Sequence, residues 1–469
     1  MAKDIALSPP APREPVPAVG QGITATTGSV KAIPLKGRGC YNARMANVVS
    51  IIMAGGQGSR LYPLTKVRSK PAVPVAGRFR LIDISISNCI HSNVRSIFVL
   101  TQFASESLHR HIFTTYRFDN FHRDFITLLS AQQTLENRNW YQGTADAVRQ
   151  NLNFIEDAGS LILVLAGDHL YRMDYRKFLE SHERTGADIS VAVTPVRAEQ
   201  APEFGVMKVN SQGRITEFSE KPKAAADIDR MSVPEDIFKK FGVPDEGRTH
   251  LASMGVYLFN QNVLRDLLAH NDYKDFGREV IPHAIGERRV FGHFFDGYWE
   301  DIGTIPSFFE AHMDLTRPLP KFDFYDEDRP IFTQARFLPG SKILASEVEN
   351  AILCEGSIVN RSRIRDSIVG IRSRIGDNCR LERTVIMGAD YFESREDQAL
   401  NRENGVPDVG VGRDCEIRNA IVDKNARIGH GVRLVNRNGA ANESAENYVI
   451  VDGIIVVPKS AVIPDGTVI

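Results

Sequence analysis

An aliphatic residue recurs at every sixth position over the last quarter of the chain, and this spacing restricts the possible folds more than any other feature. Ordinary strands alternate with a period of two, so they do not explain it. A period of six is typical of the hexapeptide repeats of a parallel β-helix, in which each residue stacks on its counterpart in the next coil. The recurring residues are Ile352, Ile358 and Ile364; Val369, Ile375, Leu381 and Met387; Val411 and Ile417; Val422, Ile428 and Leu434; and Val451, Val457, Ile463 and Ile469. The acidic, Asn-rich stretch 389–408 interrupts the period, and we expect it to be a loop excluded from the coil.

Residues 47–315 show a different pattern, in which short β-branched runs alternate with longer amphipathic stretches. This alternation predicts an α/β domain with a parallel sheet wrapped by helices. The strands are expected at 48–53, 96–101, 161–165, 189–195 and 255–259, and helices at 146–154 and 175–185. Three prolines between positions 316 and 338 indicate a linker, after which the β-helix is expected to occupy 339–469.

The first 46 residues are rich in Pro, Ala, Gly and Thr and contain only Asp4 and Glu14 as acids. They fit three interpretations: a disordered extension, a transit peptide, or an extension that precedes a true start at Met45. We expect a disordered extension, because the segment shows neither a helical nor a strand period, and the other two interpretations remain as alternatives.

The composition excludes several classes of protein. With 57 basic and 58 acidic residues the net charge is −1, so no global field attracts nucleic acid. The five cysteines form no CxxC pair, which suits a reducing compartment and argues against a zinc site. The apolar run at 161–166 is too short to span a membrane. We therefore expect a cytoplasmic protein, or a plastid one only if the N-terminal segment is a transit peptide.

The first predicted strand leads into "MAGGQGSRLYPLT", where Gly55, Gly56 and Gly58 precede Arg60. Glycines allow backbone N–H groups to approach a phosphate, and arginine adds a charge-assisted fork. Lys70, in "SKPAVPVAG", could supply a second cation to the same phosphates. An ordinary turn with surface cations remains the alternative.

Two carboxylates are placed to share a metal. Asp168 lies just beyond an apolar strand in "AGDHLY", at the sheet edge where ligands of α/β proteins gather. Asp301 follows another expected strand in "YWEDIGT", and the nearby Gly303 suggests close backbone approach. Two carboxylates together suit Mg²⁺, which retains waters and uses substrate phosphates. Asp168 could instead only cap a helix.

Two further groups suit a sugar phosphate or a nucleotide. Glu220 and Lys221 end a strand in "FSEKP", where the lysine suits a phosphate monoester and the glutamate suits hydroxyl groups. Tyr141, Gln142 and Gly143 precede a helix and offer amphipathic edges to a base or a sugar. Charged strand ends and buried aromatic residues are common, so both groups also have purely structural explanations.

The His- and Arg-rich stretch 109–123 lacks a third metal ligand at proper spacing, so we interpret it as a solvated helix and loop. No Ser/His/Asp or Cys/His grouping stands out. The pattern favours a site that holds phosphates and a metal without a covalent nucleophile.

The motifs, taken in order, closely resemble those of the glucose-1-phosphate adenylyltransferases (ADP-glucose pyrophosphorylases). The resemblance covers residues 47–469, and the motifs are especially similar to those of the cyanobacterial and plant small-subunit type. It implies a Rossmann-like nucleotidyltransferase domain followed by a left-handed parallel β-helix. The motifs that carry it are "AGGQGSRLYPLTKVRSKPAVPVAG", "RLIDISISNC", "WYQGTADAVRQ", "AGDHLYRMDY", "FSEKP", "LASMGVYLF", "YWEDIGT" and "IVDKNARIG".

The resemblance implies that ATP and glucose 1-phosphate give ADP-glucose and pyrophosphate, the committing step of glycogen or starch synthesis. It assigns Asp168 and Asp301 to Mg²⁺, and Arg60 and Lys70 to the ATP phosphates. The nucleotide and sugar residues that it implies are Gly55, Gly56, Gly58, Tyr141, Gln142 and Gly143 for the nucleotide, and Gly205, Glu220, Lys221 and Ser253 for glucose 1-phosphate.

The resemblance also implies regulation by anions, with Lys424, Arg427 and Lys459 binding a 3-phosphoglycerate-like activator opposed by orthophosphate, within a homotetramer. Val67 replaces the lysine that enteric relatives use for a sugar bisphosphate, which makes that activator doubtful.

Three other functions fit the sequence less well. The adenylyl-type motifs argue against an enzyme of this fold using another nucleotide, and the candidate histidine of a hexapeptide acyltransferase, His430, lies where a polar residue is usually only exposed. A non-catalytic regulatory subunit should have lost Asp168, Lys70 or Arg60, and all three are present.

Overall fold

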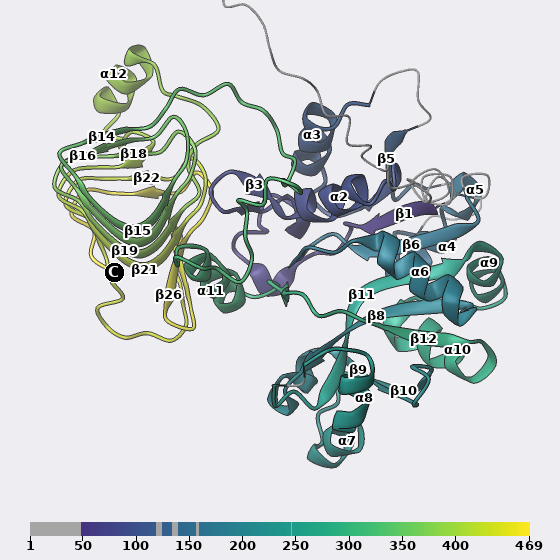
Figure 1. Ribbon diagram of the computed structural model, residues 1–469. Helices are drawn as coiled ribbons and strands as arrows, with labels where there is room; N and C mark the ends of the chain where they lie inside the picture. Colours follow the sequence, from purple (N-terminus) through teal and green to yellow (C-terminus); the bar gives the residue numbers. More distant parts are fainter. Residues whose placement is uncertain (1–47, 119–123, 134–138, 156–158, 245) are drawn as a thin grey trace, which may run out of the picture. The chain divides into compact units, whose positions relative to one another are not determined.

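A mixed β-sheet organises the first part of the protein (Figure 1). The computed structural model describes residues 48–118, 124–133, 139–155, 159–244 and 246–469, all within the unit Cys40–Ile469. The interpretations of segment 1–46, including Met45 as a start, therefore lie outside the described residues. In that described part, the nine-stranded sheet has the order β10-β9-β11-β6-β1-β4-β5, with β8 beside β11 and β12 beside β8. Its strands are β1 (Val48–Met53), β4 (Ser96–Thr101), β5 (Phe125–Ser130), β6 (Leu161–Ala166), β8 (Ile189–Val196), β9 (Gly205–Val209), β10 (Ile215–Glu220), β11 (His250–Asn260) and β12 (Val290–Phe294).

The expected parallel sheet is only partly correct. The strands β6, β1, β4 and β5 are parallel neighbours, whereas β11 is antiparallel to β6, β8 and β9. β11 is buried along most of its length, so its sequence reads as the continuous apolar run that a parallel strand also has. Strand direction was therefore not encoded in the hydrophobic pattern.

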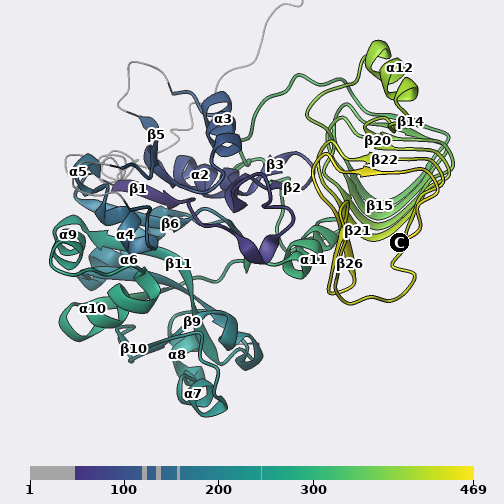
Figure 2. The same ribbon diagram turned by 180° about the vertical axis from the view of Figure 1, so that it is seen from behind.

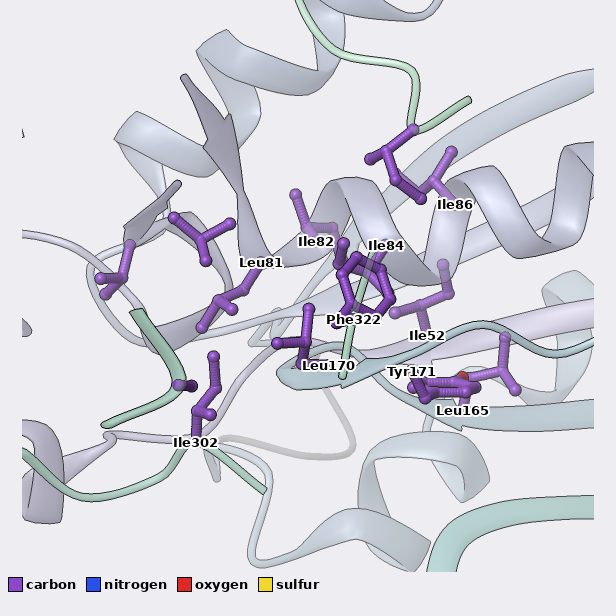
Figure 3. Packing of buried hydrophobic residues seen from close by; sticks show 14 of the residues in the cluster. Ile52, Leu81, Ile82, Ile84, Ile86, Leu165, Leu170, Tyr171, Ile302 and Phe322 are labelled. Atoms are coloured by element: carbon purple, nitrogen blue, oxygen red, sulfur yellow. The ribbon is translucent and has the colours of Figure 1, made fainter. Parts of the chain in front are cut away.

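Helices cover both faces of the sheet, and β1 shows why its sequence is apolar throughout. Val48 and Ile52 pack into one core cluster, and Val49 and Ile51 pack into the other. Figure 3 shows part of the first cluster, where Ile52 lies near Leu165 and the aliphatic side chains of α2. The helices of this part are α2 (Leu81–His91), α3 (Glu106–Thr115), α4 (Thr144–Arg149), α5 (Leu152–Ile155), α6 (Tyr175–Thr185), α7 (Ala225–Arg230), α8 (Glu235–Lys240), α9 (Gln261–Ala269), α10 (Ile281–Glu287) and α11 (Ile305–Leu315).

Short elements complete the domain. The expected helix at 175–185 is α6, which Asp174 caps and Gly186 ends in the left-handed conformation. The expected helix at 146–154 is divided into α4 and α5. The remaining short elements are β2 (Pro74–Val75), β3 (Phe79–Arg80), β7 (His169–Tyr171), β13 (Trp299–Asp301), the 3₁₀ segments η1 (Ser59–Leu61), η2 (Lys70–Ala72) and η3 (Ala198–Glu203), and the π-helical segment η4 (Phe276–Val280).

The second part of the chain is a parallel β-helix, as the period of six predicts, and it is left-handed, as the resemblance implies (Figure 2). Equivalent residues stack from coil to coil, so Ile364 pairs with Leu381, which pairs with Ile417, which pairs with Leu434. All four side chains are buried. The strands are β14 (Lys342–Leu344), β15 (Glu347–Leu353), β16 (Ile358–Asn360), β17 (Arg363–Val369), β18 (Arg374–Ile375), β19 (Arg380–Ile386), β20 (Gly410–Val411), β21 (Glu416–Val422), β22 (Arg427–Ile428), β23 (Arg433–Leu434), β24 (Glu443–Ser444), β25 (Val449–Val451), β26 (Ile454–Val457) and β27 (Val462–Ile463).

The stretch 389–408 leaves the coil as expected, but it is not only a loop. It contains the helix α12 (Arg395–Glu403), which begins with a capping box between Ser394 and Asp397. The period-six analysis did not find this helix because no residue of α12 is buried, so its sequence lacks an apolar stripe.

The predicted linker contains no helix or strand, yet it packs against the α/β core. Phe322 and Ile331 are buried there, and the ring of Phe324 stacks on that of Phe79 at 4.5 Å. The β-helix also contacts this domain directly. Gly77 of the α/β domain lies so close to Cys354 of the β-helix that a Cβ atom on Gly77 would be 2.8 Å from the Cys354 sulfur. No helix of the described chain has the length and apolar character needed to cross a membrane.

Candidate active site

The glycine turn forms one wall of a cavity of about 240 Å³ beyond the end of β1. Gly56 and Gly58 line this cavity, and Gly55 precedes them in the turn. Gly58 has φ of 62°, a left-handed conformation, and a Cβ atom there would lie 3.0 Å from the Cβ atom of Lys70. Glycine at this position therefore lets the turn lie against the segment that carries Lys70.

The pairing of β7 with β13 brings the two predicted carboxylates together. Asp301 is opposite His169 in this antiparallel pair, and Asp168 immediately precedes His169. The buried Nζ atom of Lys70 lies 2.9 Å from Asp168 Oδ2 and 2.8 Å from Asp301 Oδ1. Arg60 is more exposed, with Nη2 3.8 Å from Asp301 Oδ2. The four predicted catalytic residues thus form one charged cluster.

This cluster favours the ionised forms of its members. Burial alone would lower the pKa of Lys70, but Asp168 and Asp301 hold it above its ordinary value. Burial likewise opposes ionisation of Asp301, yet His169, Lys70 and Arg60 together lower the pKa of Asp301 to about 2. The carboxylate of Asp301 is therefore available as a ligand across the neutral pH range.

The donor set fits Mg²⁺ better than a transition metal. No group of three or more His, Cys, Asp or Glu side chains that could hold a metal occurs among the described residues. Two carboxylates with an adjacent open cavity match the preference of Mg²⁺ for few protein oxygens plus waters and phosphates. A Cβ atom at Gly303 would lie 2.8 Å from Asp301 Oδ1, so glycine there leaves room around this carboxylate, as its position in the sequence suggested.

A second cavity, of about 210 Å³, adjoins the first and shares Met53 with it. Gly205, Glu220, Lys221 and Ser253 all line it, together with Asp301. The four residues that the resemblance assigned to glucose 1-phosphate therefore face one space next to the charged cluster.

Local backbone features aim these side chains into the second cavity. A Cβ atom at Gly205 would lie 2.6 Å from Glu220 Oε2, so glycine lets that carboxylate keep its present position. Lys221 has φ of 51°, in the left-handed region that non-glycine residues adopt uncommonly. Ser253 lies where the pairing of β11 with β8 shifts register. Burial raises the pKa of Glu220, although the adjacent Lys221 opposes this.

Tyr141, Gln142 and Gly143 line neither cavity. The phenol of Tyr141 accepts a hydrogen bond from Asn151, and the N–H of Gln142 donates to Asp146. A Cβ atom at Gly143 would lie 2.3 Å from the carbonyl oxygen of Lys274, so this glycine allows two chain segments to meet. The residue that follows, Thr144, does line the second cavity.

The sequence did not predict several residues that line the second cavity. His169 and Trp299 line the second cavity, and the Trp299 N–H donates to His169 Nδ1 at 3.3 Å. Both lie within motifs already noted, so adjacency to Asp168 and Asp301 was the available signal. Tyr257 and Asp275 also line it, and no motif marked Asp275. Asp275 is brought in by η4, whose N-terminus it caps.

A third cavity, of about 580 Å³, contains the predicted regulatory lysines. Lys424 and Lys459 line it from the β-helix, and Arg68, Arg80 and Arg336 line it from the other segments. Arg427 is not among its lining residues, because its guanidinium pairs with Glu393 at 2.7 Å and donates to the carbonyl of Pro407. Of the three predicted residues, the structure thus brings two together.

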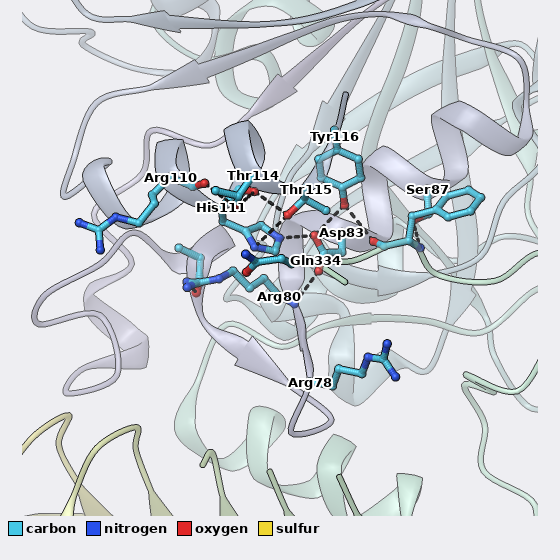
Figure 4. A network of polar contacts seen from close by, with 12 residues as sticks. Arg78, Arg80, Asp83, Ser87, Arg110, His111, Thr114, Thr115, Tyr116 and Gln334 are labelled. Atoms are coloured by element: carbon cyan, nitrogen blue, oxygen red, sulfur yellow. Dashed lines mark hydrogen bonds and ion pairs between the residues drawn. The ribbon is translucent and has the colours of Figure 1, made fainter. Parts of the chain in front are cut away.

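One part of the stretch 109–123 is not solvated as expected. His111, on α3, is buried and pairs with the fully buried Asp83, which also accepts a hydrogen bond from Tyr116 at 2.7 Å (Figure 4). Burial opposes ionisation of Asp83, but His111 and Tyr116 keep its pKa below the ordinary value. This pair could not be predicted from the sequence, since Asp83 and His111 lie on different helices. Residues 119–123 are outside the described chain.

Two family models match the chain. The nucleotidyl transferase model matches residues 49–318, and the model of the GLGC left-handed parallel beta-helix domain matches residues 336–468.

Proposed function

Because the chain belongs to the nucleotidyl transferase family, we propose that it transfers the adenylyl group of ATP to α-D-glucose 1-phosphate, giving ADP-glucose and pyrophosphate. The combination of this domain with the GLGC β-helix fits the ADP-glucose pyrophosphorylase family. The observation that carries the proposal is the contact of Lys70 with both Asp168 and Asp301. Asp168 lines the first cavity, beside the glycine turn, and Asp301 lines the second cavity, beside Glu220 and Lys221.

In this proposal each cavity holds one substrate. The triphosphate lies along the glycine turn, where Gly56 and Gly58 let backbone groups approach its oxygens and Arg60 pairs with them. The sugar phosphate lies in the second cavity, with its phosphate on Lys221 and its hydroxyl groups on Glu220. The two substrates then meet beside Asp301.

The chain's residues act by positioning and by electrostatics. Asp168 and Asp301 would hold Mg²⁺, which when bound supplies positive charge to the phosphate oxygens. An oxygen of the sugar phosphate attacks the α-phosphorus of ATP in line, and the pyrophosphate leaves on the opposite side. Lys70 and Arg60 offset the charge that develops on the departing pyrophosphate. No side chain needs to form a covalent bond with substrate in this scheme.

We also propose that the third cavity is regulatory and binds a small phosphorylated acid such as 3-phosphoglycerate, with orthophosphate as its competitor. Its cations support this ligand class, and two contacts connect the cavity with the segment that carries Lys70. Arg80 donates to the carbonyl oxygen of Ala72, which lies in the same turn as Lys70. Arg68, two residues before Lys70, forms a buried pair with Asp423, which precedes Lys424. An anion that shifts these side chains can therefore alter the position of Lys70.

The test is pyrophosphate release by the full chain with Mg²⁺ and glucose 1-phosphate, measured separately with ATP, UTP, GTP and dTTP. ATP should support turnover far better than the others, and 3-phosphoglycerate should increase the rate. Preference for another nucleotide would refute the adenylyl assignment. Absence of turnover with all four would favour a non-catalytic subunit.

A further inference from the structure

The carboxylate of Asp390 lies directly on the two regulatory lysines. Its Oδ1 atom accepts a hydrogen bond from Lys424 Nζ at 2.6 Å, and its Oδ2 atom lies 3.0 Å from Lys459 Nζ. Asn425 also donates to Oδ2, at 3.1 Å. The Asp390 N–H donates to Asn425 Oδ1 at 2.8 Å, which fixes the backbone at this point. Three donors thus converge on one carboxylate, as they would on an oxyanion ligand.

Asp390 comes from the segment that the β-helix expels, not from a coil. It is the second residue of the stretch 389–408, and it lines the third cavity together with Lys424 and Lys459. Three residues further along, Glu393 also holds this stretch in place by pairing with Arg427. The stretch therefore inserts an acidic side chain into a cavity formed by other parts of the protein.

The cavity contains more positive than negative charge. Its acidic lining residues in the described chain are Glu106 and Asp390, and Glu106 pairs with Arg110 on the same helix. Arg80 donates to the carbonyl oxygen of Ala72 and the hydroxyl of Ser107, which are both neutral. A single carboxylate thus faces both lysines.

The charge balance also appears in the electrostatics. Burial disfavours the charged form of Asp390, but Lys424 and Lys459 hold its pKa well below the usual range. Burial lowers the pKa of Lys424 to about 8, with Arg80 and Arg336 adding to the effect and Asp390 opposing it. The cavity would therefore gain from a ligand with more than one negative charge.

We propose that Asp390 is an internal competitor that occupies the position of a phosphorylated ligand's anionic group, and that the ligand binds by displacing this carboxylate. The inference rests on the proposed regulatory role of the third cavity and adds a mechanism to it. A monovalent anion gains little by replacing a carboxylate of equal charge, whereas a dianion adds charge where the cavity lacks it. Asp390 therefore lowers the affinity for all anions and favours those that carry two or more charges.

The test is the binding of orthophosphate to Asp390→Asn, measured by calorimetry on the full chain at pH 7. Asparagine keeps the shape and removes the charge. We expect the Kd for orthophosphate to fall at least about tenfold relative to the parent. Glu396→Gln is the matched control, because it removes one charge from an exposed residue of α12, and its Kd should not change.

The outcomes separate the two proposals. If the parent binds orthophosphate and Asp390→Asn binds it equally or more weakly, Asp390 orients the lysines and the inference is wrong. If neither protein binds orthophosphate or 3-phosphoglycerate, the regulatory role of the cavity fails, and the inference fails with it. The catalytic proposal is tested separately by turnover.

A second measurement needs no variant and covers the case in which Asp390→Asn does not fold. Hydrogen exchange of the parent should become faster in residues 389–394 when orthophosphate is added, because the displaced carboxylate no longer anchors this segment. The coil segment around Lys424 should become slower to exchange. Slower exchange in both segments would overturn the inference.

Discussion

Replacing Gly205 by alanine should impair use of the sugar phosphate more than it destabilises the protein. Gly205 pairs with Glu220 across the β9–β10 ladder, and the added Cβ atom would lie 2.6 Å from Glu220 Oε2 and 2.6 Å from the ring tip of Phe218. An ordinary contact begins at 3.4 Å, so the carboxylate must move by about 1 Å. Glu220 is the residue proposed to bind the sugar hydroxyl groups, and it lines the second cavity.

A displacement of about 1 Å at a positioning group costs roughly tenfold to a hundredfold in rate, or about 1.4 to 3 kcal/mol. We expect kcat/KM for glucose 1-phosphate to fall by this factor, while the KM for ATP stays near its original value. Pyrophosphate release under varied concentrations of each substrate measures both. Gly292→Ala is the control, because its Cβ atom would make only ordinary contacts, the nearest at 3.5 Å. Unchanged kinetics for the sugar phosphate in Gly205→Ala would refute the placement of Glu220.

Four other results are expected. Asp168→Asn should lower kcat by at least about a hundredfold, or roughly 3 kcal/mol, because one carboxylate is missing from the proposed metal site; near-normal kcat would show that Asp168 is no ligand. Lys221→Gln should raise the KM for glucose 1-phosphate strongly and that for ATP little, and equal damage to both would indicate a structural role. Lys424→Ala should raise the 3-phosphoglycerate concentration for half-activation by about tenfold while sparing unactivated turnover, and an unchanged response would exclude this lysine. Burial lowers the pKa of His312 to about 4, so the unfolded chain takes up a proton below about 6.5 that the folded chain refuses. Stability should therefore fall as the pH drops from 6.5 towards 4, by up to roughly 3 kcal/mol; the urea midpoint of His312→Gln should fall less over that range, and parallel curves would contradict this.

The β-helix was predictable because its repeat is enforced by stacking. Each coil buries its aliphatic residue against the next, as Ile364 does against Leu381, so the period is visible without any long-range information. The helix α12 was not predictable in this way, since none of its residues is buried and it shows no apolar period.

Strand positions in the α/β domain were predicted more accurately than strand directions. The bounds of β1 and β4 agree with the expected ranges 48–53 and 96–101. The direction of β11 depends on the chain path through β9 and β10, which leaves no trace in a strand buried on both faces.

The charged centre was predictable as a set of residue types at strand ends, although not as a geometry. That Asp168 and Asp301 share Lys70 depends on the pairing of β7 with β13, two strands of three residues each. Such short strands carry no recognisable period. Asp275 was missed for a related reason, because it reaches the second cavity only through the tertiary position of η4.

In the proposed function the adenylyl group passes directly from ATP to the sugar phosphate at the centre formed by Lys70, Asp168 and Asp301. Exchange of labelled pyrophosphate into ATP tests it most directly, because the exchange needs the reaction to run in both directions. We predict exchange when Mg²⁺, ATP and glucose 1-phosphate are all present, and none when the sugar phosphate is omitted. Exchange without glucose 1-phosphate would reveal a covalent nucleotidyl-enzyme intermediate. Absence of exchange when glucose 1-phosphate is present would contradict the proposed reaction itself.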